Sequence, residues 1–316
     1  MTTDGPLRTV VGSLVFQNPI VLAAGTAGYG RELTGVMHAD RLGGIVTKAV
    51  SAAPRHGAPS PRVAEFEGGM INAVGLANPG LESVRREQLP WLAANLLDTR
   101  KIVNVVGFTI EEYPTVVAGI EESLRDHPRA VDAFELNVSC PNTKAGGMEF
   151  GADPTSLAAV VSAARRETKR PVFVKLSPVL PNIAEAARIA ADSGADAISV
   201  VNTIPGLVID VERRRPVLGF GTGGVSGPAI MPVGVLATWK VSRAVQLPVL
   251  GLGGVASASD ALQYILAGAS LVGIGTAALR EPRVPERIVK ELTAWCSKHG
   301  VTDIQTLRGT LEWPSA

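Results

Sequence analysis

A cysteine stands at the end of an apolar strand in the sequence Glu135-Leu-Asn-Val-Ser-Cys-Pro-Asn142. Residues 133–138 have the pattern of a buried strand, and Pro141 follows Cys140 directly. Proline cannot continue a central strand because it has no backbone N–H, so the thiol lies where strand gives way to loop. In a β/α barrel that end of a strand carries the chemistry. Cys140 is then a general base or nucleophile; the alternative is a structural cysteine in the core, where most free thiols lie.

Two lysines occur in apolar strands. Lys48 ends the run Ile45-Val-Thr-Lys48, and Lys175 lies within Val172-Phe-Val-Lys-Leu176. Because burying an unpaired ammonium group is costly, each lysine is expected to meet a partner or a ligand. The alternative is a side chain whose stem packs on the protein while its charge stays in water.

Asparagines gather at the predicted strand ends and in the loops that follow them. Asparagine is unfavourable inside strands and offers both a hydrogen-bond donor and an acceptor. One such residue could form an Asx turn, whereas several on one rim predict a surface for a planar ligand that carries amide groups. The residues are Asn72, Asn104, Asn137, Asn142 and Asn202.

The last two predicted strands end in glycine-bearing turns, Gly251-Leu-Gly-Gly254 and Gly273-Ile-Gly-Thr276. Glycine lets backbone amides approach an anion, and a following helix N-terminus favours negative charge. In β/α barrels the loops after strands seven and eight often bind phosphate. As a pair, the turns predict a phosphorylated cofactor or substrate, although either one alone could be purely structural.

Other kinds of site find little support. The four histidines fall in predicted helices, turns or loops, and no HxH or HExxH spacing occurs, so no metal is expected. No GxSxG elbow is present, and no GxGxxG follows the first strand, which argues against a hydrolase and a Rossmann domain.

The elements that must position these residues alternate between strand and helix. Alternation of this kind implies right-handed crossovers and a parallel sheet, and eight apolar strands favour a closed barrel. The predicted strands are residues 19–24, 44–49, 101–106, 132–139, 171–176, 195–201, 247–252 and 271–275. The predicted helices are residues 83–97, 114–125, 154–168, 182–193, 232–245, 257–267 and 285–299, and the helix before the second strand is the least convincing unit.

Two further features complete the expected architecture. Residues 7–17 predict a small hairpin that closes the barrel floor. The strand-to-helix segments 50–78, 140–153 and 202–230 are long, and loops of that length inside a domain usually carry function. Without a linker or an internal repeat, residues 1–316 are expected to form a single α/β domain, a (β/α)8 TIM barrel with long loops at the C-terminal face of the strands.

The composition limits the fold class, the binding partners and the compartment that can be expected. The chain has 316 residues, 46% of them hydrophobic and 4% aromatic, which suits parallel strands under close-packed helices. Its net charge of +1 favours neither nucleic acid nor an anionic membrane. Two cysteines, Cys140 and Cys296, make neither a disulfide framework nor a CxxC pair, which indicates a cytoplasmic protein. We expect no signal peptide and no membrane span.

Together these residues resemble dihydroorotate dehydrogenase, the flavin barrel of pyrimidine biosynthesis, over nearly the whole chain from Asn18 to Ala277. The resemblance is carried by Thr47-Lys-Ala49, Pro61-Arg-Val63, Asn72-Ala-Val-Gly-Leu76, Leu136-Asn-Val-Ser-Cys-Pro-Asn142, Val174-Lys-Leu-Ser-Pro178, Val201-Asn-Thr203 and Gly223-Gly-Val-Ser-Gly-Pro228. Membrane-bound class 2 members use serine as the base, so Cys140 is similar to the cytosolic class 1. Residues 143–151 with Asn202-Thr203 are most similar to class 1B, whose members use NAD through an FAD and [2Fe-2S] electron-transfer subunit.

The resemblance implies a set of site residues in this chain. FMN would be held by Ala24, Lys48, Ala49, Asn104, Asn137, Lys175, Val201, Gly227, Gly253, Gly254, Gly275 and Thr276. Dihydroorotate or orotate would contact Lys48, Asn72, Ala73, Val74, Gly75, Leu76, Asn137, Asn202 and Thr203. Cys140 would be the general base. Two features depart from the family or stay unassigned: Ala24, where many relatives have serine, and the basic segment Val211-Glu-Arg-Arg-Arg215.

The chemistry fits these residue types. Oxidation of the C5–C6 bond removes a proton from C5 and a hydride from C6, so the flavin takes the hydride and the protein provides a base and the geometry. A thiol with an ordinary pKa of about 8.5 is partly ionised at cellular pH. Lys175 would stabilise the anion of reduced FMN if it faces the N1–C2 edge of the ring, and Lys48 would lie between flavin and substrate carboxylate.

The resemblance leaves alternatives open. The chain could be another flavin barrel, a dihydropyrimidine- or dihydrouridine-type reductase, but Lys48 and residues 72–76 suit a carboxylated pyrimidine. It could be a fumarate-linked class 1A enzyme. A third alternative is a non-enzymatic barrel that binds a phosphorylated ligand and keeps Cys140 in its core. A homodimer is usual for the family, and a heterotetramer with the electron-transfer subunit is expected for class 1B.

Overall fold

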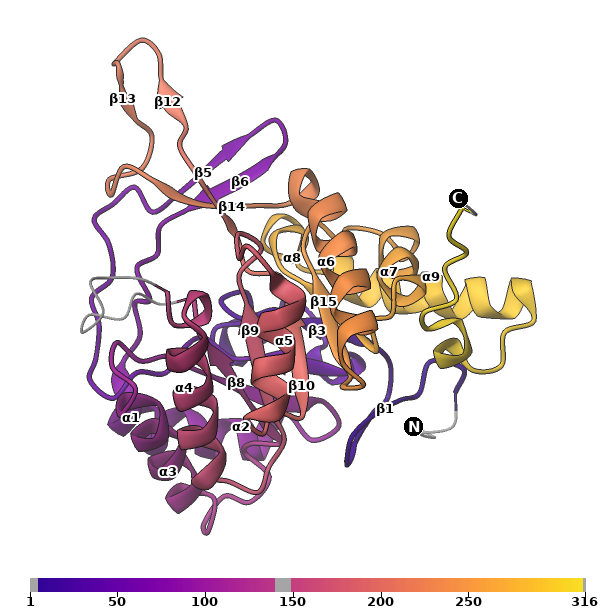
Figure 1. Cartoon of the computed structure of the whole chain (residues 1–316), viewed down its shortest axis with the longest axis horizontal. Helices are drawn as coiled ribbons and strands as arrows, with labels where there is room; N and C mark the ends of the chain where they lie inside the picture. Colours follow the sequence, from indigo (N-terminus) through magenta and orange to yellow (C-terminus); the bar gives the residue numbers. More distant parts are fainter. Residues whose placement is uncertain (1–4, 140–148, 315–316) are drawn as a thin grey trace.

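The computed structural model describes residues 5–139 and 149–314. Within them, eight parallel strands close into a barrel in the order β10-β15-β16-β3-β4-β7-β8-β9, which confirms the predicted fold class (Figure 1). The strands are β3 (Ile20–Leu22), β4 (Gly44–Val46), β7 (Arg100–Val105), β8 (Ala133–Asn137), β9 (Val172–Leu176), β10 (Ala197–Val200), β15 (Val249–Leu252) and β16 (Leu271–Ile274). Each lies inside one of the predicted runs, except that Arg100 precedes its run by one residue.

Helices form the outer layer around the strands (Figure 1). Several are capped by the residue types that the sequence puts at their starts: Asp153 accepts from the backbone of Ser156 at 2.8 Å, and Ser257 with Asp260 forms a capping box. The predicted helices are present as α3 (Glu112–Ser123), α4 (Pro154–Arg166), α5 (Ile183–Asp192), α6 (Met231–Ala244), α7 (Ala258–Leu266) and α9 (Val284–His299), and a short α8 (Thr276–Arg280) follows β16.

Two helical segments differ from the prediction. The helix expected at 83–97 consists of α1 (Gly80–Ser83), a π-helical turn (Val84–Gln88) and α2 (Leu89–Asn95). Pro90 cannot donate a backbone hydrogen bond, which accounts for the change of helical register before it. Between β3 and β4, the described chain has only the 3-10 turns Arg31–Leu33 and Ala39–Arg41.

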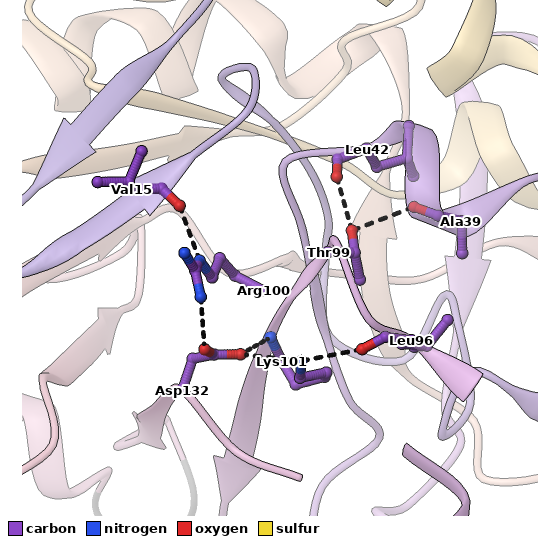
Figure 2. Close-up of polar contacts among 8 residues, drawn as sticks. All are labelled: Val15, Ala39, Leu42, Leu96, Thr99, Arg100, Lys101 and Asp132. Carbon is purple, nitrogen blue, oxygen red and sulfur yellow. Dashed lines mark hydrogen bonds and ion pairs between the residues drawn. The ribbon is translucent and has the colours of Figure 1, made fainter. Parts of the chain in front are cut away.

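The N-terminal hairpin closes the barrel floor, as predicted. β1 (Thr9–Val11) pairs with β2 (Leu14–Phe16), and Val11 and Phe16 join the apolar cluster inside the barrel. The Arg100 guanidinium links β7 to this hairpin, donating to the Val15 carbonyl at 2.7 Å and to Asp132 at 3.0 Å (Figure 2). The hairpin is therefore fixed to the base of the strands.

The long segments 50–78 and 202–230 are not only loops, because they share a second sheet. β5 (Val63–Phe66), β6 (Gly69–Asn72), β11 (Ile204–Gly206) and β14 (Gly223–Ser226) pair in the order β11-β14-β6-β5. A hairpin of β12 (Ile209–Asp210) and β13 (Arg215–Pro216) projects beyond this sheet (Figure 1). These strands were missed in the sequence because all are short, and β11 and β14 also contain glycine and are not fully buried.

The barrel interior changes character along the strands. Successive side chains of a strand point to opposite faces, so residues two apart share the interior. Five apolar interior residues are Val46, Ile102, Ala133, Phe173 and Ala197. Two positions further along the same segments stand Lys48, Asn104, Glu135, Lys175 and Ser199. The interior is thus apolar near the floor and polar toward the carboxyl ends of the strands.

Candidate active site

A buried hydrogen-bond network forms the base of the polar region. Asn104 Nδ2 donates to Glu135 Oε1 at 2.8 Å, and Ser199 Oγ donates to Glu135 Oε2 at 2.7 Å. All three residues are at most 1% exposed. The sequence pattern predicts a role for Asn104 but none for Glu135 or Ser199. The signal was present, because a glutamate two residues before Asn137 in an apolar strand must share its interior face.

The two predicted lysines lie at the level of this network or above it. Lys175 is 6% exposed, and its position in β9 is paired with Asn137 of β8 and with Ser199 of β10. Lys48 follows β4, is half-buried, and donates its backbone N–H to Gly28 at 2.7 Å. Neither ammonium group has an ion-pair partner in the part of the chain that the structure describes. Both cations are therefore available to an anionic or electron-rich ligand.

Asn137, Asn202 and Thr203 meet at the rim where the ends of β8 and β10 flank β9. Asn202 Nδ2 donates to Asn137 Oδ1 at 3.4 Å, and the backbone N–H of Ser139 donates to the same oxygen at 3.2 Å. The backbone of Thr203 donates to Asn202 Oδ1 at 2.9 Å. Two of the predicted substrate residues, Asn137 and Asn202, thus contact one another across the end of β9, which lies between their strands.

The predicted substrate segment 72–76 enters the rim from the second sheet. Asn72 ends β6 and donates to the Gly224 carbonyl of β14 at 3.2 Å. Leu76 has a left-handed backbone, with φ +57°, an uncommon conformation for a residue with a side chain. Asn78 stabilises it by donating to the Leu76 carbonyl at 2.8 Å while accepting from the Gly80 backbone at 2.9 Å.

The glycine turns surround a cavity of about 190 Å³, lined by residues that include Gly227, Gly254, Gly275 and Thr276. A Cβ at Gly254 would lie 2.8 Å from the Gly227 carbonyl oxygen, and Gly254 has φ +74°. The turn therefore depends on glycine at this position. Thr276 Oγ1 donates to Ser226 Oγ at 2.8 Å. Such a cradle fits a phosphate group.

Each of the chain's three tyrosines donates its hydroxyl to a backbone carbonyl of a predicted flavin residue. Tyr29 donates to Ala49 at 3.1 Å, Tyr113 to Asn137 at 2.8 Å and Tyr264 to Gly253 at 2.6 Å. Burial, helped by a nearby carboxylate, raises the pKa of Tyr29 and Tyr264 well above the usual range, so both hydroxyls stay protonated donors. Sequence reasoning missed these contacts because each joins residues that are 11 to 24 positions apart in the sequence and meet only in the folded chain.

Two further predicted flavin residues, Ala24 and Val201, are apolar. Ala24 is half-buried against the interior cluster. Val201 is 2% exposed, and its backbone N–H donates to Leu252 at 3.1 Å. The proposed base, Cys140, and Asn142 lie outside the described residues. Cys296 lies buried in α9, as expected of a packing residue.

Burial raises the pKa of Glu149, and a hydrogen bond from Ser177 partly offsets this effect.

Among the described residues, no cluster of His, Cys, Asp and Glu could bind a metal ion. Within the same ranges, none of the helices is long and apolar enough to cross a membrane.

Comparisons with known proteins agree with this site. The family model described as dihydroorotate dehydrogenase matches residues 6–295. A protein of Pelobacter propionicus named dihydroorotate dehydrogenase B (NAD(+)), catalytic subunit, is 45% identical over 302 residues, covering 96% of this chain and 97% of its own. Proteins with the same name from Trichlorobacter lovleyi and Desulforudis audaxviator are each 44% identical and cover 96% and 95% of this chain.

A family match over most of the chain and relatives above 40% identity leave no room for the alternative of a non-enzymatic barrel. They also agree with the class expected from the motifs. The chain belongs to the dihydroorotate dehydrogenase family of oxidoreductases and groups with its class 1B catalytic subunits.

Proposed function

We propose that this chain oxidises (S)-dihydroorotate to orotate in the synthesis of pyrimidine nucleotides, with FMN as its flavin. The polar rim above an apolar barrel is the single observation that carries the proposal. Two buried or half-buried lysines and several amides meet there, next to a glycine cradle suited to a phosphate. Cations and amides together suit a flavin and a carboxylated pyrimidine better than an uncharged ring.

The proposed FMN residues fall into two groups by their position, one for the phosphate and one for the ring. The cradle residues Gly227, Gly253, Gly254, Gly275 and Thr276 would bind the FMN phosphate, while Ala24, Lys48, Ala49, Asn104, Asn137, Lys175 and Val201 would surround the ring. When bound, the flavin accepts the hydride from C6 of the substrate. The negative charge of a reduced flavin would be stabilised by Lys175, which has no anionic partner within 4 Å among the described residues.

The substrate would lie under the second sheet. Asn72, Ala73, Val74, Gly75 and Leu76 would contact one edge of the pyrimidine, and Asn137, Asn202 and Thr203 the other. Lys48 would pair with the carboxylate. Cys140, the residue after Ser139 in the sequence, would accept the C5 proton as a thiolate, so that the thiol and the reduced flavin together would account for both departing hydrogens.

We further propose that the electrons leave through a partner subunit carrying FAD and [2Fe-2S], to NAD, in a heterotetramer built on a homodimer of this chain in the cytoplasm. The relatives' printed name, a catalytic subunit of an NAD(+) enzyme, supports a partner. The β12–β13 hairpin, where Val211 is 78% exposed, contributes no residue to the proposed FMN and substrate sites.

Anaerobic stopped-flow reduction tests both parts. Dihydroorotate should bleach the bound flavin, and uncarboxylated dihydrouracil should not do so at comparable concentration; the reverse preference would favour a dihydropyrimidine-type reductase. Reoxidation of the isolated chain should be slow with fumarate, quinone and NAD, and NAD should become efficient once the partner is added. Efficient reoxidation of the isolated chain by fumarate would identify a class 1A enzyme instead.

A further inference from the structure

Glu135 is a buried carboxylate that the proposed mechanism does not use. It is 1% exposed and lies in the barrel interior between the apolar cluster and the polar rim. In the described part of the chain, the other buried carboxylate, Glu286, is paired with Arg41 at 3.2 Å, whereas Glu135 has no ion pair within 4 Å. An unpaired buried charge is costly, so its retention calls for a local reason.

The hydrogen bonds of Glu135 give that reason. Each carboxylate oxygen accepts one hydrogen bond, Oε1 from Asn104 and Oε2 from Ser199. Because Asn104 donates through Nδ2, the direction of its amide is set, and Oδ1 has no partner among the described residues. The backbone of Asn104 is fixed as well: its N–H donates to Thr47 Oγ1 at 3.3 Å, and its carbonyl accepts from Val50 at 2.9 Å.

The charge of Glu135 also acts at the level of the expected flavin ring. Lys175 is paired in the sheet with Ser199, the second donor to Glu135, and both side chains belong to the barrel interior. Asn137, two residues beyond Glu135 on β8, is paired with Lys175 from the other side. In this poorly hydrated interior, a fixed negative charge below Lys175 opposes negative charge on a ligand above it.

We propose that Glu135 is a positioning residue for the flavin, acting through Asn104, whose amide it orients, and through its charge, which makes the reduced flavin less stable. The inference rests on the proposed FMN site and adds a residue to it. Gln at position 135 would keep an acceptor for Asn104 but lose the charge, whereas Leu would lose both. The two substitutions therefore separate orientation from charge.

The test measures FMN affinity and the flavin reduction potential, without substrate turnover, in the unmodified chain and in Glu135→Leu, Glu135→Gln and Ser199→Ala. We expect Glu135→Leu to weaken FMN binding about tenfold, since a buried amide loses its charged partner. Glu135→Gln should restore the affinity to within about twofold and shift the potential to a more positive value. Ser199→Ala, which leaves the Asn104 contact intact, should retain FMN.

The results test the orienting role of Glu135 and the effect of its charge separately. Unchanged FMN affinity in folded Glu135→Leu, or equal losses in Glu135→Leu and Glu135→Gln, would overturn the orienting role. An unshifted potential in Glu135→Gln would overturn the role of the charge, and this variant decides alone if Glu135→Leu does not fold. A chain that binds no FMN even when unmodified would instead refute the proposed function.

Discussion

Lys101 and Asp132 form an ion pair beneath the barrel, with 3.3 Å between Nζ and Oδ2 and only 4% of the lysine side chain exposed (Figure 2). Asp132 also accepts from the backbone of Lys101 at 2.8 Å, and Lys101 Nζ donates to the Leu96 carbonyl at 3.0 Å. The pair ties the start of β7 to the segments on both sides of it, far from the polar rim. Its role is therefore in stability and not in chemistry.

Removing one partner of this pair should be costly. Asp132→Ala leaves the buried ammonium of Lys101 without a counter-charge, and we expect the free energy of unfolding to fall by about 3–5 kcal/mol. Urea denaturation followed by circular dichroism measures it. The control is Glu87→Ala, which breaks an exposed pair with Arg86 and should change stability by less than about 1 kcal/mol. Similar losses in both variants would contradict the assignment.

The cap of α4 predicts a pH-dependent contribution to stability. Hydrogen bonds from Ser156 lower the pKa of Asp153 below its ordinary value of 3.8. A depressed folded pKa means that this stability is present above the unfolded pKa and is lost as pH falls through the folded value. Asp153→Ala should thus cost about 1 kcal/mol at neutral pH and less in acid.

Asp153→Asn is the matched control for that experiment, because asparagine keeps an acceptor for the Ser156 backbone but does not titrate. The difference in free energy of unfolding between Asp153→Asn and the unmodified chain should become smaller in acid. Asp153→Asn should remain more stable than Asp153→Ala at every pH. A deficit of Asp153→Ala that stayed constant from neutral to acid pH would show that the charge contributes nothing.

Asn78 stabilises the left-handed backbone at Leu76 but lies outside the predicted contacts. Asn78→Ala should loosen the substrate segment and raise the KM for dihydroorotate about tenfold, because the side chain loses its bonds to Ser51, the Leu76 carbonyl and the Gly80 backbone. Its FMN content should not change. Asn95→Ala, which removes an exposed bond to the Trp91 carbonyl, is the control. If the two variants had equal KM values, residues 72–76 would not depend on Asn78.

The hydrogen bond from the buried Tyr264 to Gly253 is expected to strengthen FMN binding. Tyr264→Phe leaves the Gly253 carbonyl without its 2.6 Å donor and should weaken FMN binding about tenfold, because the cradle loses its fixed orientation. Equilibrium dialysis of the apoprotein against FMN measures this. Thr293→Val removes a similar hydroxyl-to-carbonyl bond on α9, distant in sequence from the cradle, and should bind FMN normally. Equal affinities for both variants would argue against a positioning role for Tyr264.

The barrel could be predicted because each buried strand and each capped helix carries its own local signal, such as Ser257 with Asp260. For the candidate site, the sequence singles out residue types that are out of place in a strand, such as Lys175 and Asn104, and the paired glycine turns; their roles stay predictions. The spacing of Glu135 from Asn137 indicates its interior position, but the hydrogen-bond partners of Glu135 and Tyr264 are brought together only by the closed barrel. The second sheet escaped prediction for the same reason, since β6 pairs with β14 across about 150 residues.

The central claim is that this barrel oxidises dihydroorotate with Cys140 as the base. Single-turnover reduction of the bound flavin by dihydroorotate, followed anaerobically in the unmodified chain and in Cys140→Ala, tests it most directly. We expect rapid bleaching in the unmodified chain and bleaching slower by about 10²–10⁴-fold in the variant, with FMN content unchanged. Equal rates in the two proteins, or no bleaching of the unmodified chain, would contradict the claim.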